Sequence, residues 1–441
     1  MRRTLKLSLF LDDHHLREMV IGSAIGLSIK VLSAVSIVFM NIVVARTLGA
    51  SETGLFFLGF TLVTIAAAAA RLGFDQSIIR FVAAARENDD IDKLHGVYRK
   101  SICWVAIASI SLTVLASFNV TWLVENFFPQ PGFEPVVRSF LIAIPLIALY
   151  TMLAQAMQGL KKIAKSLLVL NVLMPMTLLL LMMLDPVYTA EAAAEYFILA
   201  SFFALFSGLY FWHQSAPKTD KVKRFSSSQL WKTSTPLWAV VILSQVIQWS
   251  SQLMLGAWST AENVAFFATA QRTAMLASFV LFAVNAIAAP KFAALHEKGD
   301  IDGLKRIAIW SVRLMMLVAA PILMVMLLFP SWLMSFFGEE FRAASTALMI
   351  LAIGQFINIA TGSVGYLLSM TGHEKKVLSN TLLSAALAIA LGALLIPSFG
   401  LVGAAVATAT SVSAQNLLGV YQVRKHLGFN TLLFWKNKSK N

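Results

Sequence analysis

Long apolar runs, separated by short polar connections, follow one another along almost the whole chain. A helix needs about 20 mostly apolar residues to cross the hydrocarbon core of a bilayer. Twelve runs approach or exceed this length, and no connection is long enough to hold a folded domain. The pattern predicts an all-α integral membrane protein with about twelve transmembrane helices. They are expected at about residues 20–45, 53–73, 101–124, 138–158, 167–184, 192–213, 234–257, 264–289, 307–330, 343–370, 378–396 and 399–423.

The composition agrees with this pattern and excludes other classes of protein. Hydrophobic residues make up 58% of the chain and charged residues 13%, about half of the ~25% that is typical of a soluble domain. So little charge cannot cover a water-facing surface, and the apolar runs are too long for a disordered chain or an outer-membrane barrel. The single cysteine, Cys103, excludes a disulfide framework and a cysteine-based metal cluster.

The basic residues are distributed unequally between the two sides that the spans define. If the N-terminus is cytoplasmic, 28 of the 35 Lys and Arg residues fall in cytoplasmic segments. Arg46, Arg138 and Arg342 fall on the other side, and the remaining four lie within or at the edges of spans. This positive-inside bias predicts that both termini are cytoplasmic. The same bias explains most of the net charge of +13 as a consequence of membrane topology, so nucleic acid is not expected as a partner.

Polar stretches divide the spans into two sets of six. The first residues are charged and lack the apolar core of a cleaved signal peptide, so we expect a cytoplasmic amphipathic segment there. The polar stretch in the middle of the chain is placed as a linker would be. The expected organisation is a lead-in at 1–19, a six-helix bundle at 20–213, a cytoplasmic linker at 214–233, a second six-helix bundle at 234–423 and a basic cytoplasmic tail at 424–441.

An internal repeat relates the two sets of spans at an offset of 210 residues. Glu52 matches Glu262, and the run DIDxL at 90–94 matches the same run at 300–304. An offset of six spans gives both bundles the same orientation, which is a parallel repeat about an axis along the membrane normal. The alternative explanation is coincidence among the few residue types that membrane helices use. Transporters with such repeats bind their substrates between the repeats, near the midplane of the bilayer.

The deepest charge in the spans is Lys30, about ten residues into the first span, or roughly 15 Å from its start. A charge at that depth costs at least ~2.5–3.5 kcal/mol, so it usually faces a cavity or a partner. At helical spacing Lys30 shares a face with other small or polar residues, namely Ser23, Gly26, Ser33 and Asn41. We expect Lys30 to line a cavity; the alternatives are snorkelling and an ion pair.

Three arginines are the other cations within or at the edges of the spans. Arg272 lies about eight residues inside the eighth span and is expected to line a cavity. Arg313 is nearer the cytoplasmic face, where snorkelling is equally compatible with its position. Arg71 and Asp75 are four residues apart, a spacing that favours a local ion pair over a contact with substrate.

Two uncharged polar stripes complete the candidate site. Gln245 and Gln248 belong to a stripe on span 7, together with Ser244, Ser251 and Gln252. Gln355 and Asn358 belong to a stripe on span 10, together with Thr361 and Gly365. Such groups often hydrogen-bond between helices. Alternatively, these two stripes and that of span 1 line one wet cavity that suits sugars.

The chain offers little for covalent chemistry. All seven histidines lie in cytoplasmic segments or at span ends, and no phosphate-binding glycine loop, HExxH or nucleophile motif is present. We therefore expect no enzyme, no metal and no cofactor. The expected cavity is cationic and lined by hydroxyls and amides, which suits an anionic, polar substrate such as a diphosphate that carries sugars. A cation exporter would instead need buried carboxylates.

Several short stretches resemble the Wzx-type polysaccharide-export flippases, members of the superfamily that also holds the multidrug MATE exporters. They are ARTLGASETG at 45–54, RLGF at 71–74, RFVA at 80–83, QGLKK at 158–162 and FGEEFR at 337–342. The resemblance implies two six-helix bundles around a central cavity and alternating access. It also implies transfer of an undecaprenyl-diphosphate-linked oligosaccharide across the bacterial inner membrane, with other polysaccharide assembly proteins as possible partners. Lys30 and Arg272 resemble the cavity cations of these flippases.

Two other functions stay open at this point. One is a multidrug or small-molecule exporter of the same fold, which transport of a cationic dye would favour. The other is a membrane glycan polymerase or ligase. Such enzymes usually need a long external loop, and the external connections of this chain are short.

Overall fold

The computed structural model describes residues 14–219 and 225–433, so most of the predicted lead-in, part of the linker and the end of the tail lie outside the described residues. The described residues form helices joined by short connections, and no strand. The first half holds α2 (His14–Ala70), α3 (Phe74–Glu87), α4 (Ile91–Phe127), α5 (Phe133–Leu141), α6 (Ala143–Gly159), α7 (Ile163–Leu168), η1 (Val169–Leu173), α8 (Met174–Leu184) and α9 (Ala190–Ser215). The second half holds α10 (Ser227–Trp258), α11 (Ala261–Met275), η2 (Leu276–Ser278), α12 (Phe279–Glu297), α13 (Ile301–Leu328), α14 (Pro330–Ser335), η3 (Glu339–Ala344), α15 (Ser345–Thr361), α16 (Val364–Met370), α17 (Glu374–Leu427) and η4 (Thr431–Leu433).

Two glycines each divide one long helix into two arms. Gly49 has φ 74° and ψ 175° inside α2, and Gly400 has φ 49° and ψ −122° inside α17. Side chains with a Cβ rarely adopt such positive φ values, so glycine allows a sharp break without an intervening loop. In the described part of the chain, ten helices are long and apolar enough to cross a membrane. Dividing α2 and α17 at these glycines gives twelve arms, and the predicted all-α membrane fold is confirmed.

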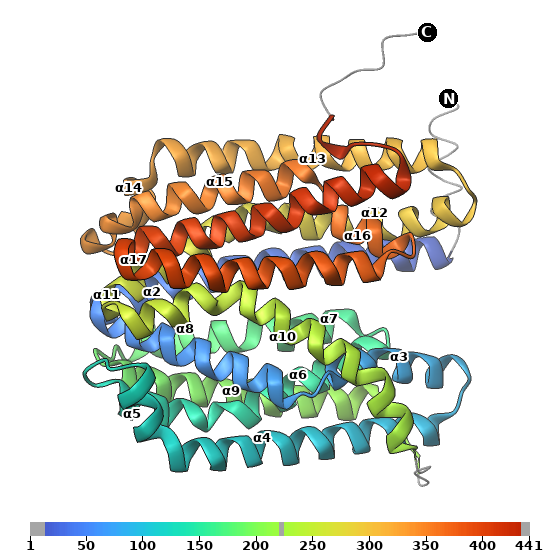
Figure 1. Cartoon of the computed structure of the whole chain (residues 1–441). Coiled ribbons are helices and arrows are strands. Elements are labelled where there is room, and N and C mark those ends of the chain that lie inside the picture. Colours follow the sequence, from blue (N-terminus) through green and yellow to red (C-terminus); the bar gives the residue numbers. More distant parts are fainter. Residues whose placement is uncertain (1–13, 220–224, 434–441) are drawn as a thin grey trace.

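The helices form two groups with three helices between them. In Figure 1, α12 to α17 make up the upper group and α3 to α9 the lower group, while α2, α10 and α11 run between the groups. α10 packs on α17, and α11 packs on α2. The side chain of Gln252, in α10, is fully buried, and its Nε2 donates hydrogen bonds of 2.8 Å to the carbonyl of Phe57 and the hydroxyl of Thr61. These bonds join the two halves of the chain through their central helices.

The predicted repeat is present in the local structure. The turn between α3 and α4 and the turn between α12 and α13 lie 210 residues apart, and each contains a residue with positive φ, 49° at Asp89 and 69° at Gly299. In each turn the following aspartate, Asp90 or Asp300, caps the next helix. Each side chain accepts a hydrogen bond from the backbone N–H three residues later, at 3.1 Å and 2.7 Å respectively. The same sequence signal therefore builds the same helix start in both halves.

One end of the molecule is closed by hydrogen bonds between the two halves. Arg46 Nε donates to the carbonyl of Phe336 at 2.7 Å, and the Glu340 carboxylate accepts from the Ala50 N–H at 2.7 Å. Gln130 Nε2 donates to two carbonyls at the end of α10, at 2.9 Å and 2.6 Å. The turns before α4, α7, α13 and α17 lie at the opposite end (Figure 1). Basic residues gather in these turns and on the helix ends beside them, among them Lys93, Lys161, Lys298 and Lys375.

The described parts of the linker pack on the N-terminal half. His95 Nε2 lies 2.7 Å from the carbonyl oxygen of Pro217, and Lys100 Nζ donates to the carbonyl of Phe225 at 2.8 Å. Helix α10 begins at Ser227, so the last residues of the stretch predicted as a linker, 227–233, are already helical. The first part of α10 also contacts α3, where the hydroxyls of Ser77 and Ser234 lie 2.7 Å apart.

Candidate functional site

An uncharged pocket of about 420 Å³ lies inside the C-terminal half. This volume is within the range of small-molecule binding pockets. Helices α10, α11, α12, α15, α16 and α17 supply its lining, and none of the described residues in that lining is charged. We call it the amide pocket, after the eight side-chain amides that line it: Gln248, Gln271, Asn285, Gln355, Asn358, Asn380, Gln415 and Asn416.

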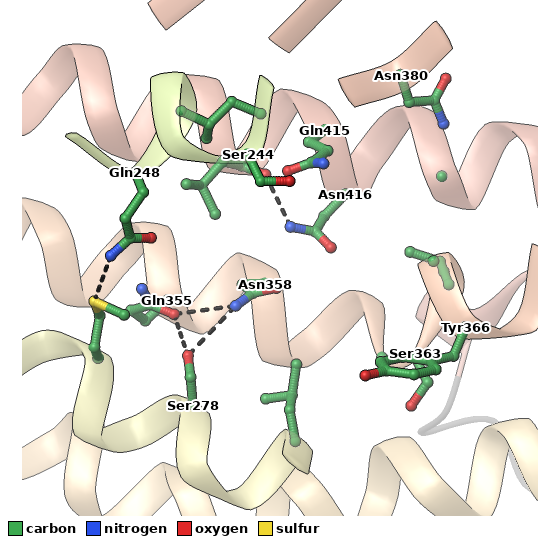
Figure 2. Close-up of a pocket in the computed structure, with 18 of the residues that line it drawn as sticks. Ser244, Gln248, Ser278, Gln355, Asn358, Ser363, Tyr366, Asn380, Gln415 and Asn416 are labelled. Carbon is green, nitrogen blue, oxygen red and sulfur yellow. Dashed lines mark hydrogen bonds between the residues drawn. The ribbon is translucent and has the colours of Figure 1, made fainter. Parts of the chain in front are cut away.

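The amides of α15 form a small network on one side of this pocket. Ser278, in the short 3-10 turn η2, donates to Gln355 Oε1 at 2.5 Å, and Asn358 Nδ2 donates to the same oxygen at 3.1 Å. Figure 2 shows the three side chains together, opposite Ser244 and Asn416. The sequence predicted that Gln355 and Asn358 share a face, and this face lines the pocket.

The stripe on span 7 divides between the pocket and the helix contacts. Gln248 lines the pocket, and its Nε2 lies 3.2 Å from the Met275 sulfur. The backbone carbonyl oxygen of Gln248 accepts a hydrogen bond of 3.0 Å from Gln271 Nε2. Gln245 lies outside the lining, and its Oε1 accepts a bond of 3.0 Å from Trp249 Nε1. The bond between Gln245 and Trp249 lies within α10, whereas Gln252 of the same stripe donates to α2, so part of the stripe binds helices together, as the alternative interpretation of the sequence stated.

Helix α17 supplies three amides that were not among the predicted site residues, Asn380, Gln415 and Asn416. Gln415 Nε2 donates to Thr381 at 3.1 Å, and Asn416 Nδ2 donates to the carbonyl one turn earlier at 2.9 Å. A sequence signal for this face exists, because Thr408, Val412, Gln415 and Gly419 recur at helical spacing on span 12 and all line the pocket.

Arg272 points into a second, smaller pocket, next to the amide pocket along α11. This pocket has a volume of about 150 Å³, and Asn41, Phe57 and Asn171 of the N-terminal half contribute to its lining. The guanidinium carbon of Arg272 lies 3.9 Å from the centroid of the Phe57 ring, with two further rings, those of Phe60 and Trp249, at 5.5 Å and 5.8 Å. We call this the arginine pocket. Its aromatic rings stabilise the cation through cation–π contacts.

Two buried polar atoms in the arginine pocket have no hydrogen-bond partner among the described residues, Nη2 of Arg272 and Oδ1 of Asn41. The other terminal nitrogen of Arg272, Nη1, donates to the carbonyl of Ala268 at 3.2 Å. Buried donors normally find partners. A free guanidinium N–H in a pocket of this size is suited to bind an anion or an ordered water.

The other predicted cations lie outside the linings of both pockets. Lys30 is half-buried, and the face that it shares packs on the N-terminal half, where Ser33 donates to the carbonyl of Asn171 at 3.0 Å. Arg313 lies beside the exposed Trp310, with 5.8 Å between the guanidinium carbon and the ring centroid. Among the described side chains, the polar stripes of spans 1, 7 and 10 are therefore divided between these two pockets. Spans 7 and 10 meet in the amide pocket, and span 1 contributes Asn41 to the arginine pocket.

Arg71 forms the local ion pair that its spacing predicted. Its Nε lies 3.1 Å from Oδ2 of Asp75, and both side chains are largely buried. Asp75 is the only buried carboxylate among the residues whose side chains the structure describes. The buried acid is thus paired with its own cation and lies outside the linings of both pockets.

Comparison with protein families identifies the family of the chain. The family described as "Polysaccharide biosynthesis protein" matches residues 20–296, well over half of the chain, and the MatE family matches residues 236–395. A probable low-salt glycan biosynthesis flippase of Haloferax volcanii is 29% identical over 171 residues, which cover 38% of this chain and 36% of that protein. An uncharacterized membrane protein of Methanocaldococcus jannaschii is 21% identical over 413 residues, covering 87% of this chain and 79% of that one.

Solved structures agree on the fold. An inward-facing multidrug resistance MATE transporter of the MOP superfamily superposes with a TM-score of 0.76 at 16% identity, covering 95% of this chain and 100% of the other. The lipid II flippase MurJ, in an inward closed conformation, superposes with a TM-score of 0.73 at 12% identity, covering 94% and 93%. The predicted resemblance is therefore confirmed: the chain belongs to the polysaccharide biosynthesis protein family, and it has the fold of the superfamily that also holds the MATE exporters.

Proposed function

We propose that this protein is a flippase that moves a lipid-linked oligosaccharide from the cytoplasmic to the outer leaflet of a membrane. The observation that carries the proposal is the pair of pockets on either side of α11. Gln271 lines the amide pocket, and the next residue, Arg272, lines the arginine pocket. Amides donate and accept hydrogen bonds as sugar hydroxyls do, while a guanidinium binds phosphate oxygens. One helix thus offers both kinds of contact that a glycan on a lipid diphosphate requires.

The closed end of the molecule supports loading of substrate from the cytoplasmic side. The hydrogen bonds of Arg46, Gln130 and Glu340 join the two halves at the end that is poor in basic residues. The positive-inside rule assigns that end to the outside. The amide pocket extends toward the other end, because Val377, in the first turn of α17, and Gly419, near its end, belong to the lining. We infer an inward-facing state that loads substrate from the cytoplasm.

We also propose a specific lipid carrier, glycan and membrane. We propose an undecaprenyl-diphosphate-linked repeat unit of an O-antigen, a capsule or an exopolysaccharide, carried across a bacterial inner membrane while the lipid tail stays in the bilayer. One half would rock against the other during transport, with both termini in the cytoplasm. The name of the Haloferax relative and that of MurJ, each described as a flippase, support the coarser part of this proposal, transport of a lipid-linked glycan. Other assembly proteins of the same polysaccharide are proposed partners.

A drug exporter of the same fold is the second candidate, and the MatE match favours it. Binding of an organic cation normally uses a buried carboxylate. In the part of the chain whose side chains are described, the buried carboxylate is Asp75, which is paired with Arg71. The cation Arg272 in the arginine pocket is suited to an anion, so the glycolipid is the better match.

Leaflet accessibility of the glycolipid tests this function in cells. In a strain that lacks the gene and has no second flippase, lipid-linked oligosaccharide should accumulate beyond the reach of a membrane-impermeant oxidant applied to spheroplasts. Expression of the wild-type chain should restore the oxidised fraction and the surface polymer. An unchanged distribution of the glycolipid and an unchanged amount of surface polymer in the deletion strain would contradict the proposal.

A further inference from the structure

The two ends of helix α17 meet at the end of the molecule where the basic turns lie, and they bring cationic side chains together. The rings of His373, just before the first turn, and His426, in the last turn, lie 4.8 Å apart between centroids. Lys376 and Lys425 lie close enough for their charges to act on the imidazole of His426. We call these four residues the α17 cluster. Among the described residues, none of the four forms an ion pair with a carboxylate.

The internal repeat gives the α17 cluster a counterpart in the N-terminal half. The turn before α7 contains Lys161 at φ 57°, and the turn before α17 contains Gly372 at φ 79°, 211 residues later. Helix α9 begins at Ala190, and the second arm of α17 begins directly after Gly400. The same offset therefore relates α7 to the first arm of α17 and α9 to its second arm.

The two halves differ in what faces the equivalent lysine. At this offset Lys165 corresponds to Lys376. Lys165 Nζ donates hydrogen bonds of 3.1 Å to Gln214 Oε1 and to Ser215 Oγ. In the C-terminal half, the lysine and the histidine near the end of α17 take the places of these two neutral acceptors. The repeat thus partners the lysine in one half and surrounds it with further cations in the other.

Membrane topology explains why cations lie at this end, because cytoplasmic segments are rich in Lys and Arg. It does not explain why they face one another, since like charges at short range are destabilising. The neighbouring residues Lys375 and Arg424 add to the charge, against one exposed carboxylate, that of Glu374. Sequences retain such local conflicts mainly at functional sites. A bound anion would relieve the conflict, and the exposed side chains of Lys376 and Lys425 are accessible to one.

The α17 cluster lies directly beside the amide pocket. Val377, which follows Lys376, and Gly419, two turns before His426, both line that pocket. We propose that the α17 cluster captures the diphosphate headgroup of the glycolipid from the adjacent leaflet, before the glycan enters the amide pocket. Lysine and protonated histidine bind phosphate oxygens through charge-assisted hydrogen bonds. The inference rests on the proposed function and adds an entry site to it.

The first experiment gives the C-terminal half the partners that the N-terminal half has. The full-length wild type and the double variant Lys425→Gln/His426→Ser are reconstituted into phosphatidylcholine vesicles with increasing mole fractions of an undecaprenyl diphosphate trisaccharide. We expect the half-saturating mole fraction to rise about tenfold in the double variant and the maximal rate of leaflet transfer to stay close to that of the wild type, because capture precedes transfer. An unchanged half-saturating fraction in the folded double variant would overturn the inference.

Lys165→Gln is the matched control, because Lys165 has the equivalent position and neutral partners. It should leave the half-saturating fraction unchanged, whereas Lys376→Gln should raise it. An equal rise in both variants would reveal a general effect of surface charge and would overturn the inference. Lys376→Gln also replaces the double variant if that protein does not fold.

The composition of the vesicles distinguishes the glycolipid from other phosphate-bearing lipids. In phosphatidylcholine the glycolipid is the only lipid with a net negative charge, so the shift in the double variant should already be present there. A shift that appears only after phosphatidylglycerol is added would assign the α17 cluster to membrane phospholipid and overturn capture of the substrate. If the wild type transfers the glycolipid no faster than protein-free vesicles do, the flippase proposal fails, and this inference fails with it.

Discussion

The guanidinium of Arg272 and the ring of Phe57 are stacked across the boundary between the two halves of the chain, 3.9 Å apart from guanidinium carbon to ring centroid. Arg272 belongs to α11 and Phe57 to the second arm of α2, and these two helices pack on each other. The cation that we assign to the substrate diphosphate is therefore also a contact between the two halves that we propose to move during transport. An anion bound to the free Nη2 of Arg272 would therefore lie at this boundary, where we expect it to couple substrate binding to the movement.

Substitution of Arg272 separates its charge from its shape. Arg272→Gln should reduce glycolipid transport at least ~10-fold, because a charged hydrogen bond to phosphate is worth about 1.5–3 kcal/mol. Arg272→Lys should keep part of the activity, since it retains the charge but loses the planar stack on Phe57. The assay is the rate of leaflet transfer, with the amount of folded protein measured in parallel. Arg313→Gln is the matched control, because Arg313 lies beside the exposed Trp310 and outside the linings of both pockets. Equal losses in the Arg272→Gln and Arg313→Gln variants would contradict the assignment.

Lys30 should matter less than Arg272. It is half-buried and lies outside the linings of both pockets, so its charge would act on the substrate at longer range. We expect Lys30→Gln to reduce transport by less than Arg272→Gln does, and Lys30→Arg to remain close to the wild type. Complementation of surface glycan, normalised to the amount of protein in the membrane, measures the difference. Complete loss of transport by a normally expressed Lys30→Gln variant would place Lys30 in direct contact with the substrate.

Gly54 permits the close approach of the two halves at the closed end. A Cβ added there would lie 1.8 Å from the carbonyl oxygen of Ala261, at the start of α11. Gly54→Ala should therefore prevent the two halves from closing at this end and lower the transport rate. The added Cβ would clash with a backbone atom of α11, which cannot move aside as a flexible side chain can. Spin labels at Phe127 and Trp332, in a Cys103→Ser background, should report a longer distance between the halves at this end.

Gly26→Ala is the control for this experiment. The added Cβ would meet only a Leu167 side-chain carbon at 3.8 Å, an ordinary contact, and alanine favours the helix by roughly 0.5–1 kcal/mol. Its label distances should match those of the unsubstituted protein. If Gly54→Ala gives the same distances as Gly26→Ala, the close approach at Gly54 does not control closure.

Topology can be measured independently of transport. A reporter inserted after Lys375, in the first turn of α17, should be cytoplasmic, and one inserted after Glu339, at the closed end, should be external. The expectation follows from the 28 basic residues on one side of the predicted spans against three on the other. Reporters on the same side would show that the number of spans between these positions is wrong.

The sequence was most informative where local chemistry determines structure. Apolar length predicted the twelve arms, because each must cross the same hydrocarbon thickness. The run repeated at 90–94 and 300–304 predicted that the two regions are equivalent, and both aspartates cap a helix, since an N-cap acts within one turn. The spacing of Arg71 and Asp75 predicted their ion pair for the same reason. In each case the deciding interaction lies between residues close together in the chain.

The sequence was less informative about which polar stripes meet. Gln355 and Asn358 share a face by helical spacing, but their position opposite Asn416 depends on the packing of α15 on α17, which periodicity does not reveal. The stripe of Lys30 had the same pattern and packs instead on the N-terminal half through Ser33. A single sequence shows which residues are on one face, whereas the crossing of the helices decides whether that face lines a pocket or joins two helices.

Leaflet transfer by the purified protein tests the central claim most directly. The full-length chain is reconstituted into vesicles with an undecaprenyl diphosphate that carries a fluorescent, uncharged trisaccharide. An impermeant quencher reports the fraction of this lipid in the outer leaflet over time. We predict that the wild-type chain transfers this lipid faster than protein-free vesicles do, and at least ~10-fold faster than the folded Arg272→Gln variant. Transfer no faster than in protein-free vesicles, together with uptake of a cationic dye by the same preparation, would contradict the flippase function and favour a drug exporter.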